Sequence, residues 1–254
     1  MKRYRYLLRS YFRFLKEKFF LLFLLLCGTV ALNFEKTNSQ FFLYNVNLSL
    51  ADNFIFLCFG FQFYFNVVLI PNFFLSLLIE KDFSANYLLR SRGAPFLWYE
   101  HVFLAFINLL LFVLFHILLV FVLKLPNTTS VINFGDKHSY LAFATNGKTV
   151  TGIEFYEIFI FVLIFLLLAG MFFNILFLFF RWIFNNWLWS FVIILIFAFF
   201  DISNVFGICT NFGVDHSKWV NFNPTLSVQL FLFVILAFKT GSFFSHRKEF
   251  FYAR

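Results

Sequence analysis

The chain has few residues that could carry out catalysis, and none of them stands in a catalytic pattern. Its five histidines are far apart in the sequence, at His101, His116, His138, His216 and His246. None belongs to H-E-x-x-H or to a similar spacing that would place two imidazole ligands together. The nucleophile motif G-x-S-x-G and the phosphate loop G-x-x-x-x-G-K-[ST] do not occur. We expect no catalytic residue, no metal site and no cofactor on this chain, so any ATP and Mg²⁺ that it depends on would bind a partner.

Five polar side chains fall within long apolar runs, where a polar group is costly and tends to face other helices or a pathway. Gln62 and Asn66 share one helical face, Asn108 and His116 share another, and Asn174 lies in a third run. Two roles are open: hydrogen bonds between helices that fix their packing, which we favour, or the lining of a substrate pathway. No chain of acidic and basic residues follows these runs, which argues against a proton-driven transporter or a proton channel.

A charged, turn-forming segment at residues 79–103 separates two long apolar runs and combines both signs of charge with apolar side chains. The break is Arg92-Gly93-Ala94-Pro95, because Gly tolerates positive φ and Pro biases the preceding residue away from the helix. We expect a short amphipathic helix over about 83–89, then a turn, and then a group of aromatic residues that leads into the next span. A membrane protein uses such a segment to contact a cytoplasmic partner. The candidate contact residues are Glu80, Lys81, Asp82, Tyr87, Arg90, Arg92 and Trp98.

The composition places these residues in a polytopic membrane protein. The chain is 62% hydrophobic with a mean hydropathy of +0.85, and 49 of its 254 residues are Phe. Several apolar runs are long enough to cross a bilayer, and a soluble domain could not bury so much apolar length. We therefore predict a single all-α transmembrane domain of six helices. The expected spans are about 19–34, 54–79, 102–123, 158–180, 187–205 and 225–244.

The last two apolar runs are short, and the chain between them is ambiguous. Asp201 and Lys239 interrupt these runs and leave each at about 21 Å, below the ~30 Å thickness of the hydrocarbon core. Residues 201–224 mix aromatic residues with Gly and Asn. They form either an ordinary external loop or a broken helix that re-enters the membrane.

The net charge of +8 is concentrated near the N-terminus, which argues against a nucleic-acid partner. Seven of the 20 Lys and Arg residues lie in the first 18 positions, and most recur on one helical face. A basic amphipathic helix over 1–18, lying on anionic lipid headgroups, explains this pattern. No A-x-A-like cleavage site follows the first apolar run, so we expect a retained span rather than a signal peptide.

The distribution of the remaining basic residues predicts the orientation. With a cytoplasmic N-terminus, fifteen Lys and Arg residues fall in inner segments and five in outer loops. The positive-inside bias therefore favours six spans with both termini in the cytoplasm.

Residues 65–123 resemble the permease subunits of ABC transporters of the type-2 exporter class, in the style of Gram-positive bacteria. The resemblance lies in Leu77-Leu78-Ile79-Glu80-Lys81-Asp82, in Asn86-Tyr87-Leu88-Leu89-Arg90-Ser91-Arg92, and in the step Trp98-Tyr99-Glu100 before the third span. The sequence resemblance is close over about 60 residues. Over the rest of the chain it is limited to the expected order of the membrane spans. One departure is the Gly93-Ala94-Pro95 break, where many members keep a polar run that ends in Lys.

The resemblance implies an N-terminal interfacial helix at 1–18, a coupling helix between the second and third spans, and broken external helices within 201–224. It implies a second permease chain, the same or homologous, and two ATPase subunits that bind ATP and Mg²⁺ and push on residues 80–100. Peptides, antibiotics, lipids and polysaccharides are substrates of the class, and antimicrobial peptide export or immunity is one expected role. The location implied is the plasma membrane.

An alternative of a different kind is a mitochondrially encoded structural subunit of a respiratory complex, in the mitochondrial inner membrane. A very high Phe content and the lack of catalytic residues suit that alternative equally well. A neighbouring reading frame with a phosphate loop would favour the exporter, and a T-rich organellar genome would favour the respiratory subunit.

Overall fold

The computed structural model describes residues 8–28 except 19, 22, 25 and 26, residues 46–80 except 59, and residues 94–124, 130–203 and 225–252. These residues form helices and loops, with no strand among them and one isolated bridge between Asn47 and Ser139. Four helices are long and apolar enough to cross a membrane: Phe61–Ile79, Ala94–Leu123, Phe155–Phe184 and Val228–Arg247. The predicted all-α class is confirmed for the described residues, and the four apolar helices fit the predicted membrane protein. The count of six spans stays a prediction, because most of the expected first span lies outside the described residues.

The span expected at 54–79 begins later than predicted. Residues 54–56 belong to a separate helix, α2 (Leu50–Phe56), which starts with a capping box between Ser49 and Asp52. The spanning helix that follows is built from α3 (Gly60–Phe63), η1 (Tyr64–Leu69) and α4 (Ile70–Ile79). A capping box gives no hydropathy signal, so the sequence pattern merged the two helices.

The middle of this span, η1, is π-helical, and its last turn is closed by a hydrogen bond from the Ile70 N–H to the Phe65 carbonyl. The π-helix directly precedes Pro71. Proline has no N–H to donate, and its ring clashes with the carbonyl four residues earlier, so a wider turn relieves the clash. The span therefore carries a built-in irregularity at its centre.

The remaining long helices are α6 (Ala94–Lys124), α8 (Phe155–Phe184), α9 (Trp187–Ile202) and α12 (Thr225–Tyr252). Helix α6 begins at Ala94 rather than at the expected 102, because Pro95 is tolerated in a first helical turn and starts the helix there. The turn expected at 181–186 is confined to Asn185, which has a positive φ of 50°, and Asn186, whose side chain caps α9. At 16 residues, α9 is about 24 Å long, shorter than a bilayer core.

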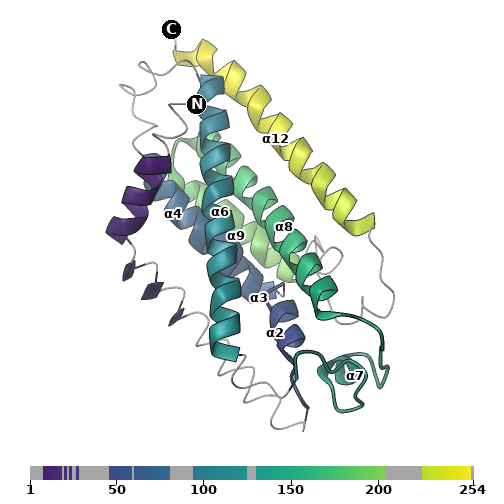
Figure 1. Cartoon of the computed structure of the whole chain (residues 1–254). Coiled ribbons are helices and arrows are strands. Elements are labelled where there is room, and N and C mark those ends of the chain that lie inside the picture. The colour runs from purple at the N-terminus through teal and green to yellow at the C-terminus, as the bar shows by residue number, and fades with distance from the viewer. Residues whose placement is uncertain are drawn as a thin grey trace.

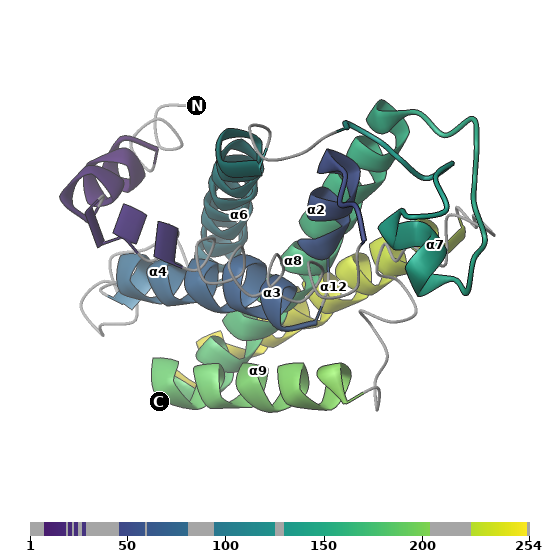
Figure 2. The same cartoon turned by 90° about the horizontal axis from the view of Figure 1, so that it is seen from below.

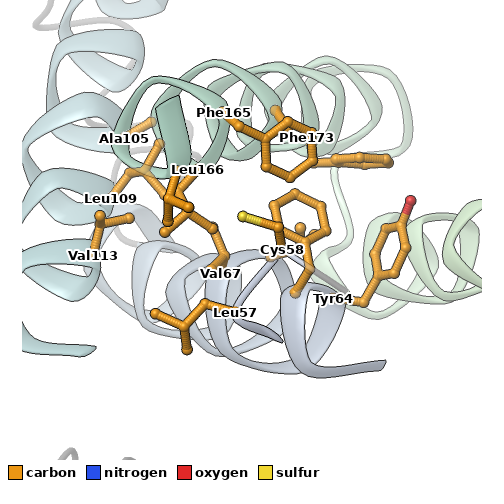
Figure 3. Packing of buried hydrophobic residues seen from close by; sticks show 14 of the residues in the cluster. Leu57, Cys58, Tyr64, Val67, Ala105, Leu109, Val113, Phe165, Leu166 and Phe173 are labelled. Atoms are coloured by element: carbon orange, nitrogen blue, oxygen red, sulfur yellow. The ribbon is translucent and has the colours of Figure 1, made fainter. Parts of the chain in front are cut away.

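Helix α8 lies at the centre of the bundle and packs against α6, α9 and α12 (Figures 1 and 2). Gly170 lets its neighbours approach: a Cβ there would lie 2.7 Å from a Leu109 methyl and 2.9 Å from a Val67 methyl. The middles of α6, α8 and the π-helix are therefore at one level. Figure 3 shows the apolar cluster around this point, which includes Leu109, Val67 and Leu166, with Tyr64 at its edge.

The bundle has two distinct ends. At the end where α4 stops and α6 starts, hereafter the α4–α6 end, lie the α8–α9 turn and the C-terminal part of α12 (Figure 1). At the opposite end, the loop 130–154, with the short helix α7 (Tyr140–Ala144), packs on α2. Backbone hydrogen bonds from Asn47 to His138 and from Leu50 to Ser130 hold the loop there.

Residues 8–18 form a helix, as predicted for the basic N-terminal segment. Arg9, Arg13 and Lys16 are exposed, while Tyr11 on another face is buried against the bundle. The amphipathic character expected of this segment stays a prediction, because Phe12 is exposed together with the basic residues. Its location at a membrane interface stays a prediction.

Candidate functional site

The predicted coupling segment starts and ends at the α4–α6 end. Glu80 closes α4 and is exposed, and Ala94 opens α6, so both anchors of the segment are described. Five of its candidate contact residues lie outside the described residues: Lys81, Asp82, Tyr87, Arg90 and Arg92.

Trp98, the last candidate contact residue, is fully buried one turn into α6. Its indole packs edge-on against Trp182 of α8, with ring centroids 6.1 Å apart. It also lies against Gly241 of α12, where a Cβ would overlap the indole ring. We call these three residues the Trp98 socket. Trp98 has no exposed surface, so its side chain makes no direct contact outside the bundle.

Polar contacts surround the Trp98 socket and involve the same helices. The hydroxyl groups of Tyr99 and Ser242 are 3.2 Å apart, which links α6 to α12. The Trp182 indole N–H donates to His101 Nδ1 over 3.3 Å, which links α8 to α6. The buried Arg181 guanidinium interacts electrostatically with the Glu80 carboxylate, which links α8 to the end of α4.

These contacts join α6 to α8 and α12. Among the described residues no group of three or more His, Cys, Asp or Glu side chains could hold a metal ion. Glu100 and His101, which the sequence pattern placed in the charged segment, are buried within α6. Close-packed aromatic rings resist compression, so the start of α6 is held tightly against α8 and α12.

The polar residues of the apolar runs have different environments. Asn108 is buried and bridges three segments: its amide N–H donates to the Pro71 carbonyl over 2.8 Å, and its Oδ1 accepts from the Tyr11 hydroxyl over 2.8 Å. Burial raises the pKa of the Tyr11 phenol, so it stays protonated and keeps its role as donor. Asn108 therefore fixes the N-terminal helix to the proline that ends the π-helix.

The other polar candidates make fewer contacts. The Asn174 amide N–H lies 3.5 Å from the Ala105 carbonyl, and His116 Nδ1 lies 3.1 Å from the Phe112 carbonyl of its own helix. Asn66 is buried, and its Oδ1 has no hydrogen-bond partner among the described residues. Gln62 is partly exposed. The five polar residues thus do not converge on one site.

One buried pair was missed in the sequence. Asp201, in the last turn of α9, is buried, and its Oδ2 accepts a 2.6 Å hydrogen bond from the Tyr64 hydroxyl at the start of the π-helix. Figure 3 shows Tyr64 with its hydroxyl pointing out of the apolar cluster. Asp201 interrupts an apolar run, and the sequence left open whether residues 201–224 form an external loop or a broken helix. The sequence could have indicated this pair, because Asp201 follows an apolar run that is slightly too short to cross a membrane. An acidic side chain at such a position needs a hydrogen-bonding partner.

The contacts around Trp98, Asn108 and Asp201 thus show which helices are joined by specific side chains. Comparison with known proteins does not assign the chain to a family. A scan of protein-family models found no match to the chain, and neither a curated protein nor a solved structure was found to match it.

Proposed function

We propose that this chain is the membrane-spanning permease subunit of an ATP-driven exporter. A separate ATPase would bind the segment between α4 and α6, and its movement would be passed through the Trp98 socket to α8 and α12. The proposal gives this chain no ATP site and no catalytic residue; both belong to the partner. The exported compound belongs to the peptide and antimicrobial classes that such exporters carry.

The observation that carries the proposal is the position of the Trp98 socket. It lies one helical turn from Ala94, where the segment joins α6, and it contacts the two neighbouring helices, α8 and α12. The negative charge of Glu80, at the other end of the segment, acts electrostatically on the buried Arg181 guanidinium of α8.

Co-purification tests the proposal most simply. Tagged protein is extracted from native membranes in mild detergent, and its partners are identified by mass spectrometry. We expect a protein with a phosphate-loop ATPase domain to co-purify with the wild-type chain. Recovery of respiratory-chain subunits in its place would overturn the proposal.

Charge reversal locates the contact. The double substitution Arg90→Glu and Arg92→Glu should remove the ATPase from the purified complex while leaving membrane insertion unchanged. The matched control is Arg247→Glu, because Arg247 is an exposed cation of α12 near the α4–α6 end. Equal loss of the ATPase from both variants would show a general charge effect and contradict the assigned contact.

A further inference from the structure

Asn72 is a buried polar residue that the sequence pattern did not mark. It follows Pro71 in α4 and shares one helical face with Val68, Leu75 and Ile79, none of which has exposed surface. These three apolar residues belong to the main core of the bundle, so the Asn72 side chain lies in the interior. Neither its Nδ2 nor its Oδ1 has a hydrogen-bond partner among the described residues. A fully buried amide needs such partners, so their source has to be found outside the side chains that surround it.

A second buried amide, that of Asn174 in α8, lies on the same level. The close contact of Gly170 with Val67 aligns α8 with the spanning helix that contains η1 and α4. One helical turn further toward the α4–α6 end, α8 reaches Asn174, and the spanning helix, with its wider π-turn, reaches Asn72. Asn174 Oδ1, like the Asn72 amide, has no hydrogen-bond partner in the described part of the chain.

The contacts of helix α6 support this alignment. Its residues Ala105 and Asn108 lie three positions apart, on one face of the helix. The Ala105 carbonyl accepts from the Asn174 amide over 3.5 Å, and the Asn108 amide donates to the Pro71 carbonyl over 2.8 Å. Helices α4 and α8 are thus held on the same face of α6, about one turn apart. Asn72 directly follows the proline that is held there.

The proline adds an acceptor to this place. Pro71 has no N–H, so one carbonyl of the preceding turn lacks the donor that residue 71 would supply in a regular helix. In membrane helices, ordered water is one of the groups that satisfy such carbonyls. Two amide oxygens, of Asn72 and Asn174, and this carbonyl therefore need donors, and Asn72 Nδ2 needs an acceptor. Water both donates and accepts, and none of these groups is charged, so the site suits water rather than an ion.

We propose that Asn72 and Asn174 bind ordered water, which bridges the spanning helix to α8 beside Pro71. This water donates to the two amide oxygens and accepts from Asn72 Nδ2, so that each buried polar atom of the two side chains has a partner. The spanning helix is then joined to α8 at its proline by an exchangeable molecule as well as by apolar packing. The inference requires neither an ATPase nor a substrate, so it is independent of the proposed function.

Radiolytic footprinting of the purified full-length chain in detergent tests the site. X-ray irradiation converts water into hydroxyl radicals, which oxidise the side chains beside it, and mass spectrometry locates the oxidised residues. The reporters are Leu75 and Val68, which lie one turn on either side of Asn72 and have no exposed surface. The references are Leu141 of α7 and Val162 of α8, equally buried residues of the same types away from the site. Because bulk radicals do not reach either set, bound water should make the reporters react at least about threefold faster than the references.

Two substitutions on different helices remove the groups that hold the water. In Asn72→Leu and in Asn174→Leu, the oxidation of Leu75 and Val68 should fall to the level of the references, while the references stay unchanged. Thermal unfolding checks that each variant is folded, and if Asn72→Leu is not, Asn174→Leu and the wild-type comparison decide the outcome. Reporters that react no faster than the references in the wild-type chain would overturn the proposal. Reporter oxidation that persists in the folded variants would overturn it as well, because the water would then be held by other groups.

Discussion

At the scale of single residues, Gly241 lets α12 approach Trp98 of α6 closely. The glycine is needed because any Cβ at position 241 would overlap a fully buried indole ring that cannot simply rotate away. The ring is confined on its other side by Trp182. This pair sets how closely α12 can lie on α6.

We predict that Gly241→Ala destabilises the folded protein by about 1–3 kcal/mol, because one methyl group overpacks the Trp98 socket. Thermal unfolding in detergent, followed by the loss of helical circular dichroism, measures the change. Val228→Ala on the exposed face of the same helix is the control and should shift stability by less than about 0.5 kcal/mol. A Gly241→Ala variant as stable as that control would mean that Trp98 does not occupy this position.

Asn108 connects residues that are remote in sequence, since Tyr11 and Pro71 lie 97 and 37 positions away. Its polarity within an apolar run was recognisable in the sequence, and so was the tendency of such a residue to bond another helix. The hydrogen-bonding partners of Asn108 were not recognisable in the sequence. Tyr11 is one of many aromatic residues, and no sequence pattern marks a proline carbonyl as an acceptor. Hydropathy identifies which residues need a partner but not which partner they find.

We predict that Tyr11→Phe costs about 1 kcal/mol, the worth of one hydrogen bond, and that Asn108→Leu costs more because it leaves the Tyr11 hydroxyl without its acceptor. The same unfolding assay measures both variants. Tyr156→Phe, at an exposed phenol of α8, is the matched control and should be neutral. The ranking is contradicted if Tyr11→Phe and Tyr156→Phe are indistinguishable and Asn108→Leu is fully stable.

At the scale of elements, the second span is joined to α9 where both are irregular. The π-helix starts at Tyr64, α9 ends near Asp201, and their side chains share a short hydrogen bond. Asp201 is buried within the bundle, so water does not reach its carboxyl group. The Tyr64 hydroxyl supplies a hydrogen bond that the Asp201 carboxyl would otherwise lack from solvent.

We predict that Tyr64→Phe loosens the last turn of α9, residues 198–203, because a buried carboxyl loses a donor. Hydrogen–deuterium exchange measured on peptides that cover this turn should show faster exchange in the variant. Residues 160–175 of α8 should keep their protection and serve as the internal reference. Unchanged exchange at 198–203 would show that the hydrogen bond does not hold the helix end.

The existence of the long helices followed from the sequence, and their limits often did not. The apolar runs at 102–123 and 158–180 are the cores of α6 and α8. Pro95 extends α6 toward its start because it is tolerated in a first turn, and the capping box at Ser49 detaches α2 from the second span. The π-helix was also unforeseen, since hydropathy does not distinguish a π-turn from an α-turn. Local backbone chemistry, rather than burial, decides these boundaries.

At the scale of the whole molecule, the connections are concentrated at one end. The Trp98 socket, the Tyr99–Ser242 contact and the Glu80–Arg181 interaction all lie at the α4–α6 end, around the two anchors of the charged segment. The opposite end is closed by a loop that packs on α2 through backbone hydrogen bonds. This asymmetry suits a protein that is pushed from one side of the membrane.

The central claim is that the segment between Glu80 and Ala94 faces the cytoplasm, where an ATPase can reach it. The most direct test is the labelling of single cysteines in intact cells with a membrane-impermeant thiol reagent, in a background without Cys27, Cys58 and Cys209. Lys148→Cys, an exposed position in the loop at the opposite end, should be labelled from outside, and Ser91→Cys should be labelled only after the cells are opened. Labelling of Ser91→Cys in intact cells would put the segment on the outer surface and contradict the account.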